Sequence, residues 1–180
     1  MKTIRSNKKG FRIHSPFVYN LVTNVLFIPA VFYVFEEIEK LEISKQEKLQ
    51  LKQLFRLLNY FQPGLIYFDE SLSDEEIIFI QKFNSEAIFK KIDVENFYKA
   101  EVADRVEKSF FILGDASELL KRNIANLGKW FFLKKTKKRR KNLIFETLFE
   151  KEDGVIFIEL FYADLIIFDK KFPSQHYVIK

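Results

Sequence analysis

Residues 65–76 read LIYFDESLSDEE, and this stretch indicates the fold more clearly than any other part of the chain. The apolar run from Leu65 to Phe68 has the length and composition of a buried strand. Ser73 and Glu76 then have the spacing of a capping box, which opens a helix that we expect to run through Phe83. A strand, a tight turn and a helix in this order are typical of α/β proteins.

Further predicted helices and strands lie before and after this unit in the sequence. A helix is predicted for residues 46–61, where leucine and phenylalanine recur at helical spacing, and Pro63 and Gly64 end it. Helices are also expected after Asp115, which can cap a first turn, and after the basic run that follows the strand at 130–133, to about Glu150. Further strands are predicted at 87–92, 109–113, 130–133, 155–161, 165–168 and 176–179. The alternation predicts an α/β fold with a Rossmann-like, mostly parallel sheet whose C-terminal edge strands are antiparallel.

Length and composition are those of one compact unit. The chain has 180 residues, enough to bury roughly two-thirds of the surface of the unfolded chain. We divide it into an N-terminal docking segment with helices, residues 1–45, and an α/β domain, residues 46–180. The absence of cysteine excludes disulfides and thiolate metal sites. Twenty-two phenylalanines predict a densely aromatic core, with some aromatic surface left for a partner.

The apolar stretch from Val18 to Phe35 is the one candidate for a membrane or export segment. Polar residues and a proline interrupt it at Asn20, Asn24 and Pro29. We therefore expect a soluble, cytoplasmic protein without membrane insertion.

The positive charge is concentrated in one run. Residues 134–141 read KKTKKRRK and hold seven positive charges, without which the net charge changes from +5 to −2. Seven charges cannot be buried without partners, so the run is expected to be exposed and to contact an anionic surface. The predicted anion-binding residues are Lys134, Lys135, Lys137, Lys138, Arg139, Arg140 and Lys141.

Two segments of the chain resemble a known family. Residues 10–19 read GFRIHSPFVY, in which His-Ser-Pro-Phe is the most specific part, and residues 155–161 read VIFIELF. Both are similar to segments of bacterial O-methyltransferase-like proteins, a group of the class I S-adenosylmethionine (SAM) dependent methyltransferases. The resemblance implies a Rossmann-like methyltransferase sheet, shortened here in the middle of the chain.

The resemblance also implies a SAM site that this sequence does not keep. In the family, the first strand leads into an acidic residue followed by two glycines, because SAM must approach the backbone closely. Tyr67 stands at the position of the acid, and Asp69 and Ser73 stand at those of the glycines. Side chains are therefore expected in the space of the cofactor, and no cofactor is predicted. If SAM is bound after all, Asp93 and Glu95 follow the second strand, where an acid holds the ribose in nucleotide-binding folds.

Metal-dependent members of the wider class end a later strand in paired acids that hold a divalent cation. Here the corresponding strand leads into Lys134 and Lys135, whose charge would repel a cation, so no metal site is predicted. No catalytic residue is predicted either. His14 has no acidic neighbour in the sequence and fits a docking segment better than a general base.

These observations favour a degenerate methyltransferase-like protein that is non-catalytic and acts as a binding or scaffold subunit for a protein partner. Two alternatives stay open. The first is a residual SAM-dependent O-methyltransferase that uses Asp93 or Glu95 and needs no metal. The second is a nucleic-acid-binding protein that uses the basic run 134–141 beside the aromatic residues 130–132.

Overall fold

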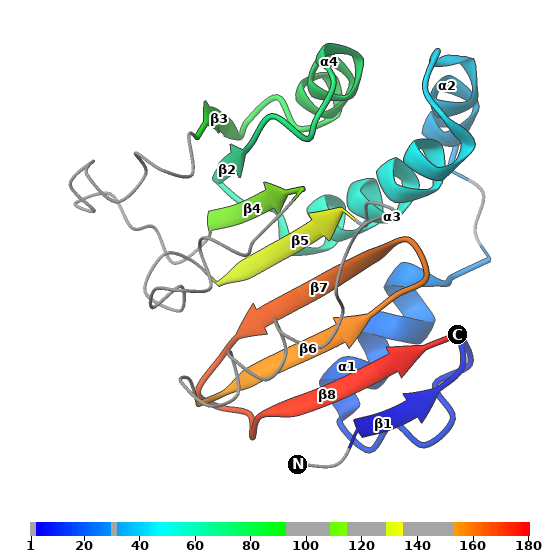
Figure 1. Ribbon diagram of the computed structural model, residues 1–180, viewed down its shortest axis with the longest axis vertical. Coiled ribbons are helices and arrows are strands. Elements are labelled where there is room, and N and C mark those ends of the chain that lie inside the picture. Colours follow the sequence, from blue (N-terminus) through cyan, green and yellow to red (C-terminus); the bar gives the residue numbers. More distant parts are fainter. Residues whose placement is uncertain (1–2, 30–31, 93–108, 115–128, 135–152) are drawn as a thin grey trace.

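A computed structural model describes residues 3–29, 32–92, 109–114, 129–134 and 153–180. These residues form an α/β fold around one eight-stranded sheet (Figure 1). The strands are β1 (Thr3–Ser6), β2 (Leu65–Phe68), β3 (Ile88–Lys91), β4 (Ser109–Leu113), β5 (Trp130–Lys134), β6 (Val155–Glu159), β7 (Ala163–Phe168) and β8 (Gln175–Ile179). The helices are α1 (Pro16–Asn20), the π-helical η1 (Leu21–Leu26), α2 (Val34–Lys40), α3 (Lys45–Phe61) and α4 (Asp74–Phe83).

The sheet is mostly parallel, with the order β1-β8-β6-β7-β5-β4-β2-β3, consistent with a Rossmann-like sheet. Only β7 runs antiparallel to its neighbours, β5 and β6. The expectation that antiparallel strands lie at the C-terminal edge is therefore wrong: β7 is inside the sheet, and β1 and β3 form its edges. The physical reason is the short turn at residues 160–162, which turns the chain back as a hairpin and leaves the other side of β7 free to pair with β5.

The predicted strand-turn-helix unit is confirmed. The strand β2 covers Leu65–Phe68, and α4 begins with a capping box in which Ser73 and Glu76 bond to each other's backbone N–H groups. The helix α3 begins with a second capping box, Ser44 with Glu47, and ends at Gln62 in a left-handed conformation. Hydrogen bonds from Ser44 lower the pKa of Glu47.

The first strand was not predicted from the sequence. Thr3–Ser6 pairs in parallel with β8, so the N-terminal region contributes an edge strand to the sheet. The segment is four residues long and alternates polar and apolar residues only weakly, and its partner is at the other end of the chain. The helix α3 begins at Lys45, the last residue of the predicted N-terminal segment, and the division itself stays a prediction.

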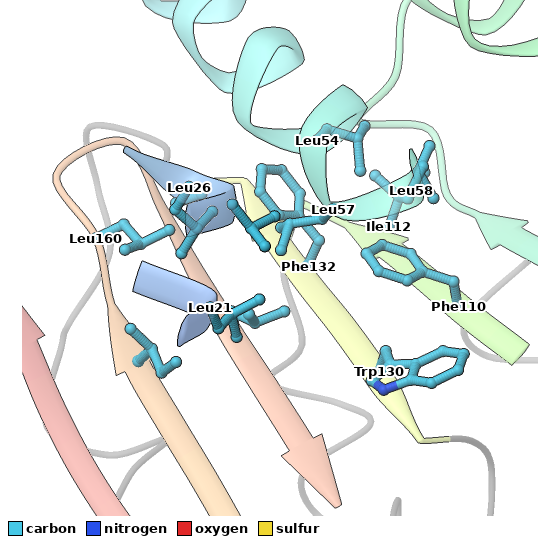
Figure 2. Packing of buried hydrophobic residues seen from close by; sticks show 14 of the residues in the cluster. Leu21, Leu26, Leu54, Leu57, Leu58, Phe110, Ile112, Trp130, Phe132 and Leu160 are labelled. Atoms are coloured by element: carbon cyan, nitrogen blue, oxygen red, sulfur yellow. The ribbon is translucent and has the colours of Figure 1, made fainter. Parts of the chain in front are cut away.

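Both faces of the central strands are buried. On one face, Leu54, Leu57 and Leu58 of α3 pack over Phe110 and Phe132 (Figure 2). On the other face, Phe111, Phe131 and Ile166 are also fully buried. Burial on both faces explains why the strands read as continuous apolar runs. The predicted aromatic core is confirmed.

The apolar stretch from Val18 to Phe35 is divided among α1, η1 and α2. Among the described residues, no helix has the length and apolar character needed to cross a membrane.

Candidate functional site at the carboxyl ends of the strands

Three parallel strands bring hydrogen-bonding groups to one end of the sheet. Asp69 follows β2, Gly114 follows β4, and Lys134 is the last residue of β5. The strands β2, β4 and β5 are parallel neighbours, so their carboxyl ends lie at the same edge. Ligands of open α/β sheets bind outside this edge, and the family resemblance places SAM here.

The Asp69 carboxylate links the residues that follow β2 and β4. Its Oδ1 accepts a hydrogen bond from the backbone N–H of Ser71, and its Oδ2 accepts one from the N–H of Gly114, both at 2.9 Å. The Asp69 N–H donates in turn to the carbonyl of Ile112 at 3.2 Å. Asp69 is buried. The carboxylate is therefore engaged with two backbone amides of this edge.

A buried ion pair links the end of β5 to the turn after β2 and the start of α4. Lys134 Nζ lies 2.9 and 2.8 Å from the two carboxylate oxygens of Glu76 and donates to the carbonyl of Ser71 at 2.8 Å. Glu76 also accepts from the N–H of Ser73 at 3.0 Å. The exposed fractions of Lys134 and Glu76 are 5% and 1%. All three donors of the ammonium group have partners, which offsets the cost of removing the two charges from water.

The expected exposure of Lys134 is therefore wrong. The capping box places the Glu76 carboxylate inside the turn, where it provides the partner that a buried ammonium needs. Residues 135–141 of the basic run lie outside the described residues, as do Asp93, Glu95, Asp115 and the expected helix that ends near Glu150. In the described part of the chain, no three histidine, aspartate or glutamate side chains are grouped as metal ligands.

The His-Ser-Pro-Phe motif forms the start of a helix. The Ser15 side chain accepts from the N–H of Val18 at 3.4 Å, and Pro16 occupies the first helical position of α1, where a missing N–H does no harm. His14 precedes this cap and is exposed. The motif thus has a local structural role.

A chain of three polar side chains was missed by sequence reasoning. His176 Nε2 lies 2.8 Å from Glu159 Oε1, and His176 Nδ1 lies 3.0 Å from Thr3 Oγ1. Because the carboxylate can only accept, it orients the imidazole so that Nδ1 faces the hydroxyl. These bonds tie β1, β8 and β6 together. No local signal could have identified them, since Thr3 and His176 are 173 residues apart in the chain.

Two hollows lined by described residues lie at the opposite end of the sheet. One, of about 420 Å³, is bordered by Gly64 and Ala87, just before β2 and β3. The other, of about 380 Å³, is bordered by Phe61, Trp130 and the Lys129–Asp169 ion pair. Burial favours a higher pKa for Asp169, but hydrogen bonds from the Lys171 N–H and from Lys129 outweigh it and lower that pKa. Neither hollow lies where the resemblance places a cofactor.

Comparisons of the chain with protein-family models, with curated proteins and with solved structures found no match. The family resemblance therefore rests on the sequence motifs quoted above.

Proposed function

We propose that this chain is a degenerate methyltransferase-like protein that is non-catalytic and acts by binding a partner. The observation that carries the proposal is the network of Asp69, Glu76 and Lys134 at the carboxyl ends of β2, β4 and β5. In α/β proteins that bind nucleotide-like cofactors, free backbone amides and small residues at this edge receive the ligand. Here the amides of Ser71, Ser73 and Gly114 are already bonded to carboxylates of the chain itself.

The energetic cost of reopening this edge supports the same proposal. A ligand in this place would have to displace Lys134 from Glu76, or Asp69 from its two amides. Separating a buried ion pair costs about 3–5 kcal/mol, which is equivalent to a factor of roughly 150 to 4,000 in affinity. The carboxylate of SAM would also lie close to Asp69 and Glu76, whose charges have the same sign. The residues present do not fit SAM well.

The first prediction is that SAM will not bind measurably to the purified chain. Isothermal titration calorimetry with SAM, and with S-adenosylhomocysteine as a second ligand of the same class, should give no saturable heat. A dissociation constant below about 100 μM would indicate a formed site and contradict the proposal. That outcome would favour the residual methyltransferase, in which case Asp93→Asn and Glu95→Gln should weaken the binding.

The second prediction is that divalent cations will not stabilise the fold. The Glu76 carboxylate is paired with the Lys134 ammonium, and both oxygens of Asp69 accept from backbone N–H groups, so a divalent cation would have to displace these partners to bind either acid. Thermal melts in MgCl₂, in CaCl₂ and in EDTA should coincide once ionic strength is matched with NaCl. A rise in melting temperature specific to one divalent ion would show that an acidic site exists elsewhere in the chain.

A further inference from the structure

A basic turn follows the first strand, β1, and is separate from the network of Asp69, Glu76 and Lys134. We define the basic turn by Lys8, Lys9, Phe11 and Arg12, all of which are exposed. The Phe11 ring is 63% exposed, and the Arg12 guanidinium lies 5.3 Å from its centre. None of the three cations has an ion-pair partner among the described residues, and the first acidic residue of the chain is Glu36. Three positive charges and an aromatic ring are thus presented to solvent together.

Hydrogen bonds hold the basic turn in one conformation. The Gly10 N–H donates to the carbonyl of Asn7 at 2.9 Å, and the Lys9 N–H donates to Asn7 Oδ1 at 3.0 Å. The Ser6 hydroxyl donates to the carbonyl of Phe11 at 2.5 Å. Gly10 and Arg12 have φ angles of 75° and 68°, which make the bend sharp. A loop that is already ordered loses little conformational entropy when it binds a partner.

A second exposed ring lies at the same end of the sheet. Phe161 is 73% exposed and belongs to the turn after β6, whose carboxyl end points the same way as that of β1 (Figure 1). This turn is also anchored, because Gln50 Nε2 donates to the carbonyl of Tyr162 at 2.7 Å. Only β8 separates β1 from β6, so two strand spacings, about 10 Å, lie between them.

Among the described residues, charge is unevenly distributed along this edge. Glu70, Asp74 and Glu75 are exposed near β2 and the start of α4, towards the β3 side of the sheet. The basic turn is at the β1 side. The described charges of this edge therefore attract an anion on the β1 side and repel it on the β2 side.

We propose that the basic turn and Phe161 bind single-stranded nucleic acid. Exposed aromatic rings near cations that have no ion-pair partner are the features that bind single strands, since bases stack on the rings and phosphates contact the cations. A membrane fits less well, because stable attachment needs two signals, and the described residues offer neither a membrane-spanning helix nor a long amphipathic apolar face at this edge. This inference rests on the proposed function, in which the chain acts by binding a partner, and it names nucleic acid as that partner in place of the protein that the sequence favours.

The test is fluorescence anisotropy of a short fluorescein-labelled oligouridine RNA, titrated with the full chain at several salt concentrations. The triple variant Lys8→Gln, Lys9→Gln, Arg12→Gln should lose at least about tenfold in affinity at low salt. Its slope of log affinity against log salt should become shallower by about 2, since each lost phosphate contact removes about 0.7. The double variant Phe11→Ala, Phe161→Ala should lose about fivefold or more for each stacked base, with the salt slope unchanged.

A matched control removes the same charge elsewhere. Lys90 on the opposite edge strand, and Lys170 and Lys171 in the turn after β7, are exposed and lie away from the basic turn. The variant Lys90→Gln, Lys170→Gln, Lys171→Gln should bind RNA nearly as the unmodified chain does. All variants replace exposed side chains, so their thermal melts should match that of the unmodified chain.

Several results would overturn the inference. One is equal loss of affinity in the control and the basic-turn variant. Another is an RNA affinity that stays unchanged in the basic-turn variant but is lost in a variant in which residues 135–141 are neutralised. Displacement of the RNA by polyglutamate at equal charge, or binding to phosphatidylserine vesicles without RNA binding, would assign the surface to an acidic protein or a lipid. The SAM titration tests the proposed function separately. If neither RNA nor SAM binds, only this inference fails. If both bind, only the proposed loss of the cofactor site fails.

Discussion

Replacing Lys134 by methionine should lower the free energy of unfolding by about 3–5 kcal/mol. Methionine has a similar length but leaves the Glu76 carboxylate buried without its cation, and the Ser73 N–H is then its one remaining partner among the described residues. The loss is expected because an unpaired buried charge retains its desolvation cost while losing its compensating interactions. Urea denaturation followed by circular dichroism measures the change.

Two variants make this result specific. In Lys134→Met, Glu76→Gln the remaining side chain is neutral and can still accept from the Ser73 N–H, so much of the lost stability should return. The control is Lys82→Met, because Lys82 pairs with Glu37 at 2.6 Å but both side chains are substantially exposed. That change should cost less than about 1 kcal/mol. Equal losses in Lys134→Met and Lys82→Met would mean that the Lys134–Glu76 pair is not buried in solution.

Replacing Gly114 by alanine should lower the free energy of unfolding by about 1–3 kcal/mol. The added Cβ would lie 2.4 Å from Cβ of Ser71, far inside contact distance. Neither side can move easily, because Asp69 is bonded to the backbone N–H groups of both residues. The same denaturation experiment measures the loss.

The double variant Gly114→Ala, Ser71→Gly removes the atoms that clash and should recover most of the stability. Gly64→Ala is the matched control, since a Cβ there meets nothing within 4 Å. It should be neutral or should stabilise by up to about 1 kcal/mol, because alanine restricts the unfolded chain more than glycine does. A Gly114→Ala protein as stable as the unmodified chain would show that the turn after β2 is looser than the structure indicates, and it would weaken the argument that this edge is closed.

The candidate site was predictable only in part. The resemblance led us to expect glycines in the turn after β2, and the sequence shows Asp69 and Ser73 there instead. The hydrogen bond from the Gly114 N–H to Asp69 could not be predicted from the sequence, since 45 residues separate them. Lys134 was expected in an exposed charge run, because a sequence shows the charges next to it and not Glu76, which is 58 residues away. The basic turn shows the same limit, because exposure of Phe11 cannot be read from its neighbours.

The sequence by itself determined the local elements of this protein. Apolar runs of four to six residues, the two capping boxes and the Pro63-Gly64 stop act within a few residues of the chain, so β2, β4, α3 and α4 follow from them. Only the tertiary structure decided the position of β7 between β5 and β6, the recruitment of β1 beside β8, and the Lys134–Glu76 pair. These features depend on contacts between residues far apart in sequence, and such contacts are selected by burial and pairing in the folded chain.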